Sequence, residues 1–109
     1  MLAPGTAVVA YLKEPREQIW GVLLRLEPAG LLIKGIDLGS FEDFLKQFPD
    51  TESRTIDLST IYYPTARLEK LLLDETGPAI PALQERFSRR AGIDIRVYVG
   101  LPDGKPEEA

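Results

Sequence analysis

Carboxylates are the side chains of this chain whose chemistry is most versatile, because they can act as acids, bases, nucleophiles or cation ligands. Six supply the raw material for such a site: Asp37, Glu42, Asp43, Asp57, Asp74 and Glu75. The chain has no histidine and no cysteine, which excludes histidine-based triads, cysteine–histidine dyads and the common zinc sites. None of the carboxylates is paired at a spacing tied to a glycine-rich loop or a cofactor motif. We therefore expect no catalytic residue, metal or cofactor, and a site at Asp74 and Glu75 is the weakest of three functional hypotheses.

Arginines form the second set of residues that could do chemistry. Four lie within eleven residues: Arg86, Arg89, Arg90 and Arg96. The first three share one face of a predicted helix, where they could clamp phosphate groups of RNA. The alternative is a solvated surface whose late arginines complement the helix dipole, and we favour it. The net charge of −4 also argues against a surface built for nucleic acid.

Composition fits one soluble domain. The 109 residues are 44% apolar and 28% charged, values that are ordinary for a globular protein. The start of the chain lacks the basic and apolar pattern of a signal peptide, and no apolar run reaches the ~20 residues of a membrane span. We expect a cytoplasmic protein that does not contact a membrane.

Three strands are predicted first, over residues 6–13, 19–27 and 31–38. Two-residue loops at Pro15–Arg16 and Pro28–Ala29 would set Ala10 opposite Gly21, and Val22 opposite Gly35. Small residues would then fall in one band across the sheet. Because missing side chains let a sheet bend, we expect the glycines to mark the corner of a closing barrel.

A short helix is predicted over residues 40–48, from an apolar stripe with helical spacing and the stop at Pro49. The stripe consists of Phe41, Phe44, Leu45 and Phe48. Ser40 and Asp43 resemble a capping box. We expect the helix to plug the open end of the barrel. The alternative is an exposed aromatic knob for a partner, with Phe41 and Phe44 as its contacts.

The second half of the barrel is less distinct. A fourth strand is predicted over residues 55–58, with Ile56 and Leu58 inward, and 59–64 would turn the chain towards a fifth strand. Residues 66–75 fit either a helix or a strand, and we favour the strand.

An appendage follows over residues 77–100. A helix over 81–92 should end at Gly92, with Glu85 paired to Arg89. After it, alternating residues predict a strand with one apolar face, which consists of Ile93, Ile95, Val97 and Val99. Residues 101–109 are predicted to be a flexible tail.

The barrel segment resembles a known family. "VVAYLKEPREQIWGVLLRLEPAGLLIKGIDL" looks like the first motif of the Sm-like proteins, which include the Hfq-type RNA chaperones, and "IDLSTIYYP" looks like the second. The resemblance covers about residues 6–75, and its apolar patterns are also typical of SH3-like barrels. It implies a small, strongly bent five-stranded barrel over residues 1–76, with the helix 40–48 inserted, and a tendency to self-associate.

RNA recognition is the family property that the sequence does not carry. Family members begin with a helix, whereas a strand starts almost at once here. They bind RNA through loops whose counterparts here hold Pro28-Ala29-Gly30 and Asp57-Leu58-Ser59, without a basic residue or a stacking aromatic.

The favoured function is therefore a non-catalytic, mainly β module that binds copies of itself or a protein partner. The predicted interface contains Phe41, Phe44 and the apolar face of residues 93–99. A two-fold dimer is our first expectation and a ring of the Sm kind the second. RNA binding through the four arginines is the alternative function.

Overall fold

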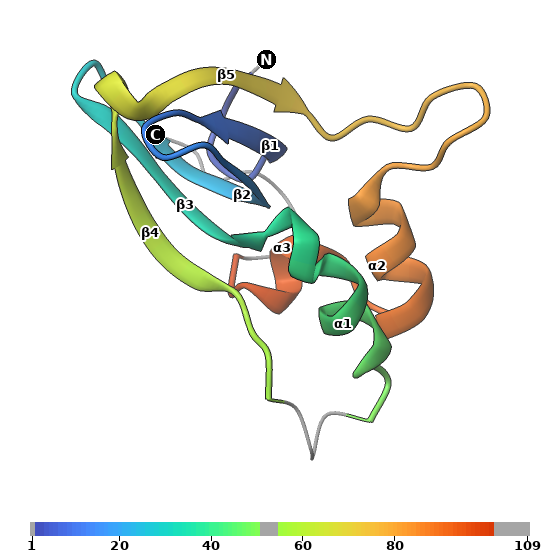
Figure 1. The fold of residues 1–109 in the computed structure, drawn as a ribbon. Helices are drawn as coiled ribbons and strands as arrows, with labels where there is room; N and C mark the ends of the chain where they lie inside the picture. The colour runs from blue at the N-terminus through green and yellow to red at the C-terminus, as the bar shows by residue number, and fades with distance from the viewer. Residues whose placement is uncertain (1, 51–54, 102–109) are drawn as a thin grey trace.

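The structure is a computed structural model that describes residues 2–50 and 55–101. It consists of a five-stranded antiparallel sheet with helices on one side of it (Figure 1). The strands are β1 (Ala7–Leu12), β2 (Glu17–Leu26), β3 (Gly30–Asp37), β4 (Ser59–Pro64) and β5 (Leu68–Leu73). The helices are α1 (Phe41–Lys46), α2 (Leu83–Ala91) and α3 (Ile95–Tyr98), with single 3-10 turns at η1 (Leu38–Ser40) and η2 (Thr65–Arg67).

The sheet is open. Its strand order is β4-β3-β2-β1-β5, so β4 and β5 lie at opposite ends and do not pair with each other. β1 pairs with β2, its neighbour in sequence, and with β5, which lies more than half of the chain away. The strand prediction for residues 66–75 is confirmed by β5. The strand predicted over 55–58 is wrong, since those residues have no regular structure and the fourth strand occupies the stretch that we had expected to turn.

Gly21 and Gly35 lie directly opposite each other in β2 and β3. The Pro28–Ala29 loop is as predicted, because Glu27 and Gly30 exchange both backbone hydrogen bonds. A bulge between Leu23 and Arg25 then shifts the register by one residue. It moves Gly35 from the predicted position opposite Val22 to the one opposite Gly21.

The predicted pairing of Ala10 with Gly21 is wrong. Leu12 pairs with Glu17, so the first hairpin has a four-residue loop, 13–16, instead of two residues. Ala10 consequently faces Ile19, and Val8 takes the place opposite Gly21. The row of small residues is therefore narrower than predicted and centres on the glycine pair.

Close backbone contact explains both glycines. A Cβ on Gly21 would lie 2.2 Å from the carbonyl oxygen of Lys34, and a Cβ on Gly35 would lie 2.6 Å from that of Trp20. Real Cβ atoms do not approach backbone oxygens so closely. Only glycine allows the two strands to come together at this point.

Two apolar cores lie on opposite faces of the sheet. Side chains of the strands themselves fill the first core, which contains Val8, Ala10, Leu12, Ile19, Leu23, Leu31, Ile33 and Tyr63. The second joins Trp20, Val22 and Ile36 to the helices. Strand residues alternate between faces, so Ile19 and Leu23 enter the first core and Trp20 and Val22 the second. Trp20 therefore lies under the helices.

The phenylalanine helix packs on a face of the sheet. Phe41, Phe44 and Phe48 are buried with Trp20, and the Phe41 ring meets the indole edge-on at 4.9 Å between ring centroids. The predicted capping box is wrong: Ser40 makes no side-chain cap, and Asp37 instead accepts a hydrogen bond from the Gly39 amide. The alternative of an exposed aromatic knob is also wrong, because Phe41 and Phe44 are 2% and 0% exposed.

Candidate functional site

The outer edge of β5 is the most exposed apolar segment with regular structure. Three of its leucines follow one another: Leu71 is half-buried, and Leu72 and Leu73 are 43% and 39% exposed. Leu68, at the start of the strand, is also only partly buried. None of the four leucines in this strand is fully buried within the described part of the chain. An apolar edge strand of this kind offers unpaired backbone groups and uncovered side chains to another strand.

The opposite edge, β4, is more polar. Its exposed side chains include Ser59, Thr60 and Tyr62, of which the tyrosine is 49% exposed. Pro64 ends the strand and has no N–H to donate. Proline and polar side chains are devices that protect a sheet edge, so β4 is less suited to pairing than β5.

The predicted strand over residues 93–99 is wrong. Residues 95–98 form the one-turn helix α3, whose N-terminus is capped by the Asp94 side chain through the Arg96 amide. Ile95 is fully buried in the second core and Val99 packs against it, while Ile93 and Val97 are 42% and 46% exposed. The segment therefore covers its own sheet. Of the predicted interface residues, only Ile93 and Val97 present substantial apolar surface.

The four arginines bind different parts of the same chain. Arg86 forms a two-pronged ion pair with Glu42 at 2.7 and 2.8 Å, and Arg89 pairs with Glu85 at 3.2 Å, as predicted. Arg90 donates to the carbonyl oxygens of Lys46 and Phe48 at the end of α1. The contacts of Arg86 and Arg90 fasten α2 to α1. Arg86 is partly buried, whereas Arg89 and Arg90 are exposed, Arg89 with 71% of its side chain in solvent.

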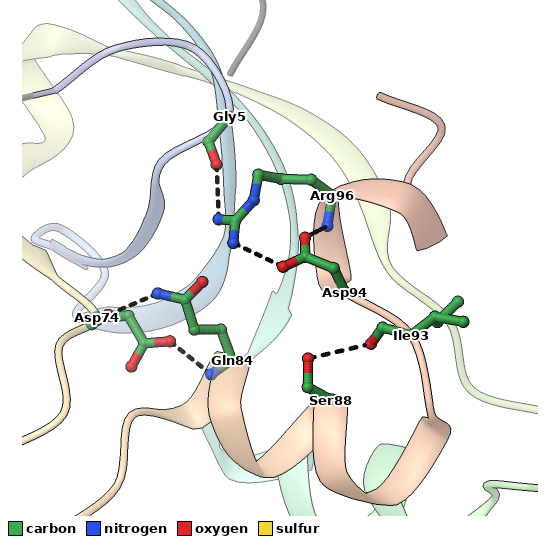
Figure 2. A network of polar contacts seen from close by, with 7 residues as sticks. All are labelled: Gly5, Asp74, Gln84, Ser88, Ile93, Asp94 and Arg96. Carbon is green, nitrogen blue, oxygen red and sulfur yellow. Dashed lines mark hydrogen bonds and ion pairs between the residues drawn. The ribbon is translucent and has the colours of Figure 1, made fainter. Parts of the chain in front are cut away.

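Arg96 completes the set and tethers the C-terminal segment (Figure 2). Its guanidinium donates to the carboxylate of Asp94 at 2.9 Å and to the carbonyl oxygen of Gly5 at 3.1 Å. The contact with Gly5 links α3 to the residues just before β1. The structure thus does not bring the four guanidinium groups together into one patch.

Asp74 is a structural residue. Its buried carboxylate accepts hydrogen bonds from the backbone amides of Leu83 and Gln84, the first residues of α2, at 2.8 and 2.7 Å. It also accepts one from the indole N–H of Trp20 at 3.1 Å. Gln84 returns a side-chain bond to the Asp74 carbonyl (Figure 2). The methyl group of Ala82 at the N-cap cannot accept a hydrogen bond, so Asp74 supplies the cap from the end of β5.

Charge and burial shift the pKa values of three groups. The two hydrogen bonds from Arg86 lower the pKa of the exposed Glu42 carboxyl, and the same contact raises the pKa of Arg86. Burial raises the pKa of the Tyr63 hydroxyl, with a smaller contribution from Glu17. These shifts reflect the contact between Arg86 and Glu42 and the burial of Tyr63.

Two open hollows lie on the surface. One, between the first hairpin and the end of β3, is lined by Arg16, Glu17, Gln18, Asp37, Leu38 and Gly39. The other, beside α2, is lined by residues that include Asp74, Glu75, Glu85, Ser88 and Asp94. Among the residues that the structure describes, no group of three or more carboxylates is placed to hold a metal ion. Of the two residues of the hypothetical carboxylate or cation site, Asp74 is buried and caps α2, and Glu75 is exposed.

No helix in residues 2–50 and 55–101 is both long and apolar enough to pass through a bilayer. No family model, curated protein or solved structure matches this chain.

Among the contacts that the sequence analysis missed, two fix the path of the chain. One is the Trp20–Asp74 bond, between residues that are far apart in sequence and have no pattern in common. The other is Gln47, whose amide oxygen accepts from the Thr55 and Ile56 amides and whose nitrogen donates to the Ile56 carbonyl. Gln47 thereby fixes the return of the chain from α1 to β4. A tryptophan in an apolar strand and an aspartate at the end of another strand are both common in sequences. Their presence therefore does not predict the first contact.

Proposed function

We propose that this chain is a non-catalytic interaction module of the Sm-like or SH3-like type, which self-associates through a free edge of its sheet. The observation that carries the proposal is the exposure of β5, an edge strand with four leucines and no fully buried residue. Natural proteins seldom leave such an edge uncovered, because it recruits further strands.

The architecture supports the family part of the proposal. Five antiparallel strands follow one another in the order β4-β3-β2-β1-β5, and a single 3-10 turn, Thr65–Arg67, joins β4 to β5. The glycine pair lets β2 and β3 approach closely where a sharply curved sheet needs it. These are features of small bent barrels, in which strands one and five are neighbours.

Self-association is favoured over RNA binding by the use of the charged side chains. Arg86, Arg90 and Arg96 already hold elements of the chain together, so binding phosphates would require these contacts to break. A strand edge, by contrast, has backbone groups that only water can satisfy in a single copy.

Light scattering of the purified full-length chain, coupled to size exclusion over a series of concentrations, tests the proposal. We expect a mass of two chains, or of a larger closed ring, that falls to one chain on dilution. A mass of one chain at every concentration would contradict the proposed function.

A further inference from the structure

The outer side of β5 exposes the backbone groups of two particular residues. The Asp74 amide donates to the Ala7 carbonyl at 3.0 Å, which shows that Asp74 faces β1. In an antiparallel sheet, the backbone N–H and C=O groups of successive residues point alternately to the strand on one side and to the strand on the other. Given the pairing of β5 with β1, Lys70 and Leu72 then also face β1. The N–H and C=O groups of Leu71 and Leu73 therefore point away from the sheet.

A bulge limits the length of the usable edge. The register between β1 and β5 shifts between Tyr11 and Leu12, so that Lys70 and Leu68 face consecutive residues of β1 and Glu69 is the extra residue. Bulges interrupt the ladder and twist the strand. The regular edge thus runs from Lys70 to the end of β5 at Leu73, with the three consecutive leucines inside it.

We propose that two copies pair through this edge, β5 against β5 and antiparallel, around a two-fold axis at Leu72. The inference rests on the proposed function and names the surface and the partner, a second copy of this chain. Leu71 of each copy exchanges both backbone hydrogen bonds with Leu73 of the other. Four bonds then join the copies, and the two Leu72 side chains face each other at the axis.

This register is the one that fits the side chains. It sets Leu71 of one copy beside Leu73 of the other on one face, and Leu72 against Leu72 on the other face, so all exposed leucines of the regular edge gain apolar neighbours. It also sets Lys70 opposite Asp74 of the second copy, and the bulge residue Glu69 opposite Glu75. The Asp74 carboxylate stays on the α2 cap, so the complementarity of the strand lies in its leucines and its backbone groups.

Neighbouring registers fit less well. An axis at Lys70 would set the two lysines directly opposite each other, which is unfavourable. An axis at Leu71 would require the bulge residue Glu69 for its outer bonds, and an axis at Leu73 would require Glu75, beyond the end of the strand. Only with the axis at Leu72 do Leu71 and Leu73 of both copies form all the backbone hydrogen bonds between the copies.

A single cysteine tests the register, because the chain has no cysteine of its own. Residues opposite each other in such a non-hydrogen-bonded pair have Cα atoms ~4.5 Å apart, within the span of a disulfide. Leu72→Cys should therefore form a disulfide-linked pair under mild oxidation, at twice the mass of one chain on a non-reducing gel. Leu26→Cys is the matched control, since Leu26 is also 43% exposed, and it should stay single. Tyr62→Cys reports on pairing through β4 instead.

Amide hydrogen exchange of the unmodified protein gives a second measurement that needs no variant. The Leu71 and Leu73 amides should exchange more slowly at high protein concentration than at low, while those of Thr60 and Tyr62 should not change. A protein that is a pair by mass, but shows neither the Leu72→Cys link nor this protection, overturns the β5 interface and leaves self-association standing. A protein that is single at every concentration overturns both.

Discussion

The indole N–H of Trp20 donates a hydrogen bond of 3.1 Å to the Asp74 carboxylate, which also caps the first turn of α2. One buried carboxylate thus joins the middle of β2, the end of β5 and the start of a helix. Because Trp20 lies in the core beneath the helices, this contact sets the position of α2 over the sheet.

Asp74→Asn should destabilise the fold. The amide retains one acceptor oxygen but turns an N–H₂ group towards donors, so at least one buried N–H loses its partner, at a cost of about 1–3 kcal/mol. Urea unfolding followed by the fluorescence of Trp20, the only tryptophan, would measure the loss. Glu75→Gln, at the exposed neighbouring position, should leave the midpoint unchanged. Equal midpoints for the two variants would contradict the cap.

Gly35→Ala tests the close contact of β2 and β3. The new Cβ would lie 2.6 Å from the Trp20 carbonyl oxygen and 2.9 Å from Cγ2 of Ile19, and we expect a loss of ~1–3 kcal/mol from the strain. Valine at the same position should cost at least as much. Thermal unfolding measures both, with Gly77→Ala as the control because its Cβ would come no closer than 3.7 Å to any atom. If Gly35→Ala melted together with the control, the contact would not limit this position.

The Arg86–Glu42 pair should make the stability of the fold depend on pH in the range where Glu42 titrates. Its hydrogen bonds lower the pKa of Glu42 below the ordinary value of 4.5. A carboxyl with a lowered pKa in the folded state stabilises the fold above its unfolded pKa, and this contribution is lost as the pH falls through the folded pKa. NMR titration of the Glu42 carboxyl should show the lowered value in the parent chain.

Two variants separate this pair from general charge effects. Arg86→Gln should return the pKa of Glu42 towards its ordinary value, whereas Arg89→Gln, whose partner is Glu85, should not. A Glu42 pKa that is the same in the parent chain and in Arg86→Gln would rule the contact out in solution.

RNA binding should be weak and electrostatic. The arginines that could bind phosphates hold other parts of the chain, and the net charge is −4. Fluorescence anisotropy with a labelled single-stranded RNA should show binding that disappears as salt is raised to physiological strength. A tight complex that resists salt would show that the chain has an RNA site that these contacts conceal.

Local patterns predicted most of the strands and the two longer helices. The Pro28–Ala29 loop, the helix end at Gly92 and the Glu85–Arg89 pair depend on neighbours in sequence, and the structure has each of them. The bulge between Leu23 and Arg25 and the four-residue first loop left no comparable pattern, so the predicted register was wrong on both sides of β2. Register depends on which side chains the two cores accept, and that is a property of the whole fold.

The C-terminal segment shows how one pattern can support two structures. Ile93, Ile95, Val97 and Val99 alternate as in a strand, yet Ile95 and Val99 are also one helical turn apart. Asp94, placed just before the turn, was the signal for a helix, and its side chain does cap α3. The helix is favoured because it places Ile95 and Val99 on the same side, where both pack on the second core.

The pairing of β1 with β5 has a consequence for how the chain reaches this fold. β1 can form a hairpin with β2 early, but its other edge meets β5 only after more than half of the chain has been made and folded back. Pairings between distant segments close large loops, which slows folding relative to local hairpins and helices. During synthesis, one edge of the first hairpin therefore stays unpaired until β5 has been made. A chain that ends before Leu68 would leave the edge of β1 open to other strands.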